Sequence, residues 1–230
     1  MSNVATTALA TLSLIATAGS SFAAALPGFT LTAQTARFSF YSRGAKVEAD
    51  KSERYLTKVE GLLGAKFEGH ADYYRHETPS EVEAATGSYA EGVTFTRERE
   101  IHSASGFHAH EIVHLVAGQL GNPGVMFQEG LAVVLGNDAK WNGVAVDKLA
   151  KHALKQAPAQ ALLAQFEKID AQVAYPVAAS FVRSLIEKHG LAKVSDFFRA
   201  CPSPAERDAA FQKTFGVAYA QAVNEWAQAI

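Results

Sequence analysis

The pattern of apolar and polar positions changes character along the chain. Residues 29–32 and 37–41 alternate polar and apolar side chains, which is the period of a half-buried β-strand. Residues 47–63 instead place apolar side chains at helical spacing between charged ones, and Gly64 follows as a helix stop. The first part of the chain therefore predicts strands and helices mixed together.

Local signals extend this prediction to about residue 105. Thr78-Pro79-Ser80-Glu81 has the form of a capping box with proline at the first helical position, so we expect a short helix running to about residue 85. Residues 66–74, 92–95 and 98–102 are predicted as short strands of a small sheet.

After Ser105 the pattern is helical almost to the end of the chain. Gly, Pro and Asn separate the predicted helices, which are 106–118, 125–136, 146–156, 159–169, 175–189, 191–200, 204–215 and 217–229. A mixed half followed by an all-helical half is typical of an α+β fold. We therefore expect one domain over residues 37–230, with a sheet-containing part at 37–104 and a helical part at 105–230.

The N-terminal residues differ in composition from the rest. Arg37 is the first charged residue, although the chain contains 21 Lys and Arg and 23 Asp and Glu. A mildly apolar run at 8–18 is followed by small residues around position 23, as in a secretory signal peptide. We predict a signal peptide at 1–24, a linker at 25–36, and export to the periplasm or the exterior. The run is shorter than the roughly 20 residues of a membrane helix, so no stable membrane span is expected.

Charge and cysteine content narrow the classes of function. The formal net charge is −2, which argues against a nucleic-acid partner because such proteins usually carry a basic excess. Cys201 is the only cysteine, so an intramolecular disulfide is excluded, and its place before Pro202 favours a structural thiol over a nucleophile.

One short motif carries a definite chemistry. His110-Glu111-Ile112-Val113-His114 is an H-E-x-x-H sequence, and residues four apart lie on one face of a helix. Two imidazoles at that spacing can bind a single tetrahedral Zn²⁺, with Glu111 beside the metal as a general base for an activated water.

A catalytic zinc needs a third protein ligand and an open fourth position. The metzincin pattern requires Gly and His where this chain has Ala117 and Leu120, so that option is excluded. Glu129 lies in an apolar stretch after a strong turn at 121–124, and a carboxylate in such surroundings is costly unless it is paired or bound to a metal. The turn should bring Glu129 back towards His110 and His114.

With these motifs the chain resembles the gluzincin metallopeptidases, in particular the peptidase MA-like domains. The similarity rests on His110-Glu111-x-x-His114 followed by Glu129-Gly130-Leu131-Ala132, with weaker support from the helix that contains Tyr175. The resemblance implies a zinc peptidase acting on a peptide or protein, with His110, His114 and Glu129 as ligands and Glu111 as the base. Tyr175 is the candidate oxyanion donor, the alternative being a tyrosine that packs at a helix start.

Two further interpretations stay open. The protein could be a catalytically inactive, zinc-stabilised binding or structural module of the cell envelope, in which a fourth ligand such as His108 or His102 closes the site. The motif could also be a coincidence, which metal analysis would decide. We otherwise expect His102 to be an ordinary strand residue, and the histidines without a partner pattern to lie at the surface: His70, His76, His152 and His189.

Overall fold

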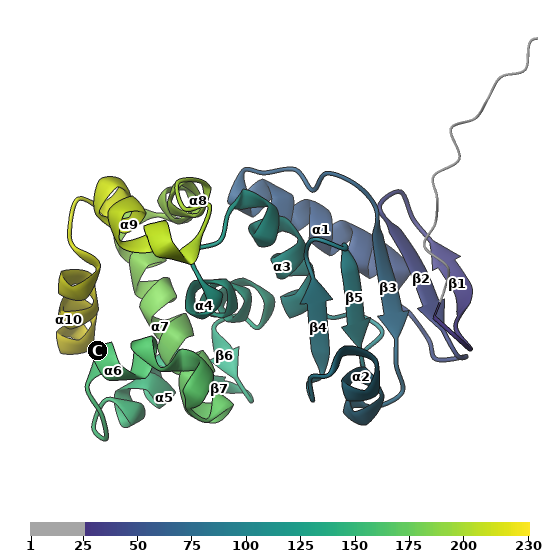
Figure 1. Cartoon of the computed structure of the whole chain (residues 1–230), viewed down its shortest axis with the longest axis horizontal. Helices are drawn as coiled ribbons and strands as arrows, with labels where there is room; N and C mark the ends of the chain where they lie inside the picture. Colours follow the sequence, from purple (N-terminus) through teal and green to yellow (C-terminus); the bar gives the residue numbers. More distant parts are fainter. Residues whose placement is uncertain (1–25) are drawn as a thin grey trace, which may run out of the picture.

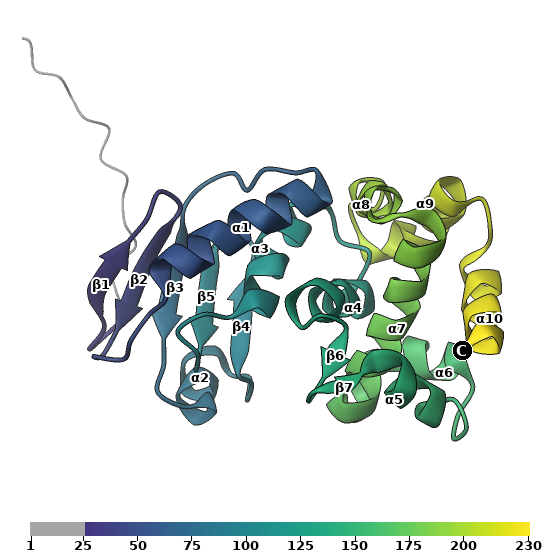
Figure 2. The same cartoon turned by 180° about the vertical axis from the view of Figure 1, so that it is seen from behind.

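The computed structural model describes residues 26–230, and the predicted signal peptide lies outside this range (Figure 1). A five-stranded sheet occupies one end of the molecule and most of the helices the other, with α3 and α4 between them (Figures 1 and 2). The strands are β1 (Thr30–Gln34), β2 (Phe38–Ser42), β3 (Ala71–Arg75), β4 (Gly92–Phe95) and β5 (Glu100–Ser103). Their order is β1-β2-β3-β5-β4, so β4 is an edge strand. The central pairs β2–β3 and β3–β5 are parallel, whereas the outer pairs are antiparallel.

The helical elements agree closely with the pattern of the sequence. They are α1 (Ala49–Leu63), α2 (Pro79–Thr86), α3 (Ala109–Leu120), α4 (Val125–Gly136), α5 (Val146–Ala153), α6 (Ala159–Ala164), α7 (Ala171–His189), α8 (Leu191–Arg199), α9 (Arg207–Phe215) and α10 (Tyr219–Ala229), with 3₁₀ turns at Phe166–Lys168 and Pro204–Glu206. Thr78 caps α2 as predicted, since its side chain accepts a hydrogen bond from the Glu81 N–H. The fold is α+β, which confirms the predicted class.

The chain departs from the prediction in three places. The strand pattern at 29–32 is confirmed by β1, but β1 pairs with β2 in the main sheet, so the segment predicted as a linker at 25–36 contains part of the folded domain. A two-stranded hairpin, β6 (Lys140–Trp141) and β7 (Val144–Ala145), interrupts the helical part. Its turn residues Asn142 and Gly143 have φ of 48° and 78°, the left-handed values that an Asn-Gly hairpin turn needs.

The third difference is the start of α7, which begins at Ala171 and not at residue 175. Asp170 caps this helix by accepting a hydrogen bond from the Gln172 N–H at 2.7 Å. Pro176 therefore lies inside the helix, where it removes one N–H donor from the ladder.

One hydrophobic core joins the two ends of the molecule. Helices α1 and α3 cover one face of the sheet (Figure 2), and the buried Phe38, Phe40 and Tyr73 pack beneath them in a cluster that continues into the helical part. A smaller aromatic cluster containing Tyr41 and Tyr74 lies on the opposite face. Among residues 26–230, no helix combines the length and the apolar character needed to cross a membrane.

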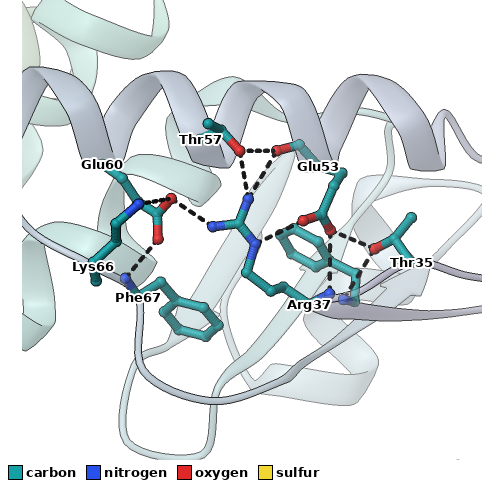
Figure 3. A network of polar contacts seen from close by, with 8 residues as sticks. Thr35, Arg37, Glu53, Thr57, Glu60, Lys66 and Phe67 are labelled. Carbon is teal, nitrogen blue, oxygen red and sulfur yellow. Dashed lines mark hydrogen bonds and ion pairs between the residues drawn. The ribbon is translucent and has the colours of Figure 1, made fainter.

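Arg37 fixes α1 to the sheet (Figure 3). Its Nε lies 2.7 Å from Glu53 Oε1, and its Nη1 donates to Glu60 Oε2. Glu60 is only 3% exposed, and it also accepts a hydrogen bond from the Phe67 N–H at 2.9 Å. Burial alone would raise the pKa of Glu60, but the hydrogen bonds from Arg37 and Phe67 lower it. The buried carboxylate of Glu60 is therefore fully paired. These contacts fix the position of α1, the helix that packs beside α3.

Candidate metal centre

Helix α3 presents both motif histidines on one face. His110 is 7% exposed and His114 is 9% exposed, whereas Ile112 and Val113 are completely buried in the core. The Nε2 atoms of the two histidines are 3.1 Å apart, so one helical turn separates two imidazoles that point at the same place.

Helix α4 supplies the third group, as the turn at residues 121–124 predicted. Glu129 Oε2 lies 2.9 Å from His110 Nε2 and 3.4 Å from His114 Nε2. Zinc bonds of 2.0–2.1 Å in a tetrahedron place neighbouring ligand atoms about 3.4 Å apart, close to the spacing found here. His110, His114 and Glu129 form a group that could hold a metal ion.

The charges of this group are mutually stabilising. Burial alone would raise the pKa of Glu129, but His114 and His110 lower it far below the usual range for a carboxyl group. Burial alone would lower the pKa of His114, but the charge of Glu129 raises it. Glu129 is therefore ionised and available as a ligand.

Glu111 lies beside this group and is positioned by the edge strand. Its side chain is 5% exposed, and its Oε2 accepts a hydrogen bond from Thr94 Oγ1 of β4 at 2.8 Å. Thr94 Oγ1 also lies 3.1 Å from the backbone oxygen of Glu111. Thr94 was not singled out by the sequence, because a threonine in a four-residue strand carries no pattern that points to the helix motif.

The three ligand candidates, Glu111 and Tyr175 all line one cavity of about 920 Å³. The ring of Tyr175 lies 6.4 Å from that of His110, centroid to centroid, and it stacks on Trp141 at 4.7 Å. Trp141 is held in turn by a 2.9 Å hydrogen bond from its Nε1 to Gln172.

The Tyr175 hydroxyl has no hydrogen-bond partner among the described residues. Burial, followed by the charges of Glu129 and Glu111, raises the pKa of Tyr175, so the hydroxyl stays protonated. It is therefore free to donate a hydrogen bond in the cavity.

His108 and His102 do not join the metal-binding group. His108 precedes α3, burial lowers its pKa, and its Nδ1 lies 3.0 Å from Ser103 Oγ. His102 lies on the opposite face of the sheet, where its Nδ1 is 3.0 Å from His76 Nε2. The prediction that His76 lies at the surface is wrong, since this side chain is 2% exposed.

In the described part of the chain, the group that could hold a metal ion thus consists of three side chains beside one cavity. No family model matches the chain, and no curated protein matches it.

Proposed function

We propose that the protein is a zinc-dependent peptidase. The observation that carries this proposal is that Glu111 and the group His110, His114 and Glu129 open onto the same cavity. Two imidazole nitrogens and one carboxylate form the ligand set of many catalytic zinc sites. A cavity of about 920 Å³ leaves room for a substrate chain beside the ligands.

When bound, zinc would lower the pKa of a water molecule and polarise the carbonyl of the substrate. Glu111 accepts a proton from that water as the water oxygen attacks the carbonyl carbon. Glu111 then donates the proton to the amide nitrogen, the C–N bond breaks, and a carboxylic acid and an amine are released. Thr94 orients the carboxylate of Glu111 for both transfers, and the Tyr175 hydroxyl donates to the oxygen on which negative charge develops.

The alternative, an inactive zinc-stabilised module, predicts a fourth protein ligand. In residues 26–230, only three His, Cys, Asp or Glu side chains come together as a potential metal group. The side chain of His108, the nearest candidate in sequence, is bonded to Ser103 instead. A fourth coordination position that no protein side chain occupies is typical of a catalytic zinc site, and it favours the peptidase over the inactive, zinc-stabilised module.

The test combines zinc content with peptide hydrolysis in three variants. Glu111→Gln should retain zinc and lose hydrolysis by at least about 10³-fold, because the general base is lost and the ligands stay. His114→Ala should lose both zinc and hydrolysis, whereas His152→Ala, which removes an exposed histidine of α5, should change neither. Full activity of Glu111→Gln on a peptide library would contradict the proposal.

The proposal extends to the substrate and the location. The substrate is a peptide or a protein, and hydrolysis takes place after export, in the periplasm or outside the cell. Mass spectrometry of exported protein from the native host tests the location, and an intact Met1 on that material would contradict a cleaved signal peptide.

A further inference from the structure

The hydrogen bonds around Ser103 favour one tautomer of His108. Ser103 Oγ donates to the Glu91 carbonyl oxygen at 3.2 Å and accepts from the Ser105 N–H at 3.0 Å. A hydroxyl has one proton, and a carbonyl oxygen can only accept. All three contacts of Ser103 Oγ can be hydrogen bonds at once only when Nδ1 carries the proton of the 3.0 Å contact with His108. In the neutral ring, Nε2 is then a hydrogen-bond acceptor.

This acceptor is available in the active-site cavity. His108 lines the cavity together with His110 and Glu111. Its Nε2 makes no hydrogen bond to any described residue, and it is not among the polar atoms that are buried without a partner. The imidazole is therefore anchored at one nitrogen and accessible at the other.

His108 lies next to the proposed base and outside the metal-binding group. A Cβ atom at Gly92 would lie 2.4 Å from His108 Nδ1 and 2.7 Å from Glu111 Cγ, so both side chains rest against the same Cα of β4. The ring centroid of His108 is 6.2 Å from that of His110. Only glycine at position 92 allows the two side chains to lie this close to the strand.

We propose that His108 Nε2 accepts a hydrogen bond from the N–H of the peptide bond that is hydrolysed. The inference rests on the proposed function, because it concerns the nitrogen to which Glu111 delivers its proton. After water attacks the carbonyl carbon, that nitrogen becomes pyramidal and carries one hydrogen and one lone pair. Holding the hydrogen at His108 turns the lone pair towards Glu111, which then completes the proton transfer. His108 is a catalytic residue in this step, and Ser103 is its positioning residue.

The experiment compares an amide substrate with its ester analogue, which lacks the N–H at the scissile bond. In zinc-loaded protein, His108→Phe should lower kcat/KM for the amide roughly tenfold, the worth of one hydrogen bond, and leave kcat/KM for the ester unchanged. His108→Gln places an oxygen acceptor near the position of Nε2 and should restore much of the loss. Equal losses on amide and ester, or no loss on the amide, would overturn the inference.

A second measurement needs no turnover. Nitrogen-15 NMR of the metal-free protein should show His108 protonated at Nδ1, and Ser103→Ala should release this tautomer preference. A ring protonated at Nε2 in the unsubstituted protein would overturn the inference. Failure of the proposed function gives a different result from failure of the inference about His108. In that case zinc-loaded wild-type protein would cleave neither the amide nor the ester, and the role of His108 would be refuted together with the peptidase activity.

Discussion

At the scale of single residues, Tyr175 offers the clearest test of transition-state stabilisation. Its hydroxyl has no hydrogen-bond partner among the described residues, and its ring stacks on Trp141 and lies 5.3 Å from the ring of Phe166. Tyr175→Phe keeps the ring and removes the donor, so we expect kcat to fall about 10²-fold with zinc content unchanged. Tyr89→Phe is the matched control, because Tyr89 lines the rim of the same cavity and is 70% exposed. Unchanged kcat with a lowered Tm would instead assign Tyr175 a packing role.

Thr94 tests how Glu111 is positioned. Thr94→Val preserves the shape of the side chain but removes the hydrogen bond to Glu111 Oε2. We expect kcat to fall about tenfold, the worth of one hydrogen bond to a charged group, with zinc content retained. Thr96→Val, in the next turn of the chain and without a side-chain hydrogen bond to Glu111, should have no effect. A loss of zinc in Thr94→Val would show that Thr94 supports the ligands and not the base.

Residues of the candidate site differ in how far the sequence predicts them. His110 and His114 are predictable because their spacing matches one helical turn, and Glu129 because an acidic side chain in an apolar helix needs a partner. Thr94 and Ser103 contact α3 and the residue before it from strands β4 and β5. Such contacts depend on how the sheet packs against the helix, which a single sequence does not reveal.

At the scale of elements, the approach of α4 to α3 decides whether the ligands meet. A Cβ atom at Gly136 of α4 would lie 2.6 Å from the Cα of His110, so the two helices are as close as a glycine permits. In Gly136→Ala the added methyl group would clash with the backbone of α3, so the backbones of α3 and α4 must shift apart. We expect a loss of about 1–3 kcal/mol in the free energy of unfolding, together with weaker zinc binding. Chemical denaturation and zinc titration measure the two effects.

Gly61 provides the control for that substitution. It lies in α1, and a Cβ atom there would have nothing within 4 Å. Gly61→Ala should therefore stabilise the protein by about 0.5–1 kcal/mol and leave zinc affinity unchanged. If Gly136→Ala behaved in the same way, close helix packing would not be what brings Glu129 to the histidines.

Elements with strong local signals were predictable, and those that depend on context were not. The range predicted for α4, 125–136, is the observed one, because a turn precedes it and the apolar run fills it. The β6–β7 hairpin was missed although Asn142-Gly143 is a strong turn signal, because its strands of two residues are too short to show alternation. Helix α7 was predicted to begin at residue 175, whereas it begins at Ala171, where Asp170 caps it.

At the scale of the whole molecule, the two faces of the sheet have different chemistry. The face covered by α1 and α3 packs into the hydrophobic core beside His110 and His114. On the opposite face, the imidazoles of His76 and His102 are buried in contact with each other. The two rings are 2% and 3% exposed, and His102 also stacks on Tyr74 at 4.9 Å. Burial lowers the pKa of each histidine from 6.5 to about 4, with the neighbouring His102 contributing for His76. Both imidazoles are therefore neutral in the folded protein near pH 7.

This buried pair predicts how the stability of the protein depends on pH. Between pH 6.5 and 4 the histidines of the unfolded chain bind protons that the folded protein does not, so the free energy of unfolding should fall as the pH drops through that range. The loss should be on the order of 3 kcal/mol for each ring, since the shift from 6.5 to about 4 spans about 2.5 pKa units and each unit corresponds to about 1.4 kcal/mol. Urea denaturation across this range measures the change in the free energy of unfolding.

The double variant His76→Phe and His102→Phe should flatten the pH dependence of stability, because it keeps aromatic side chains in the cluster and removes both titrating groups. His152→Gln, which changes an exposed histidine, should leave the slope as it is. An equally steep slope in the double variant would place the acid sensitivity elsewhere in the molecule.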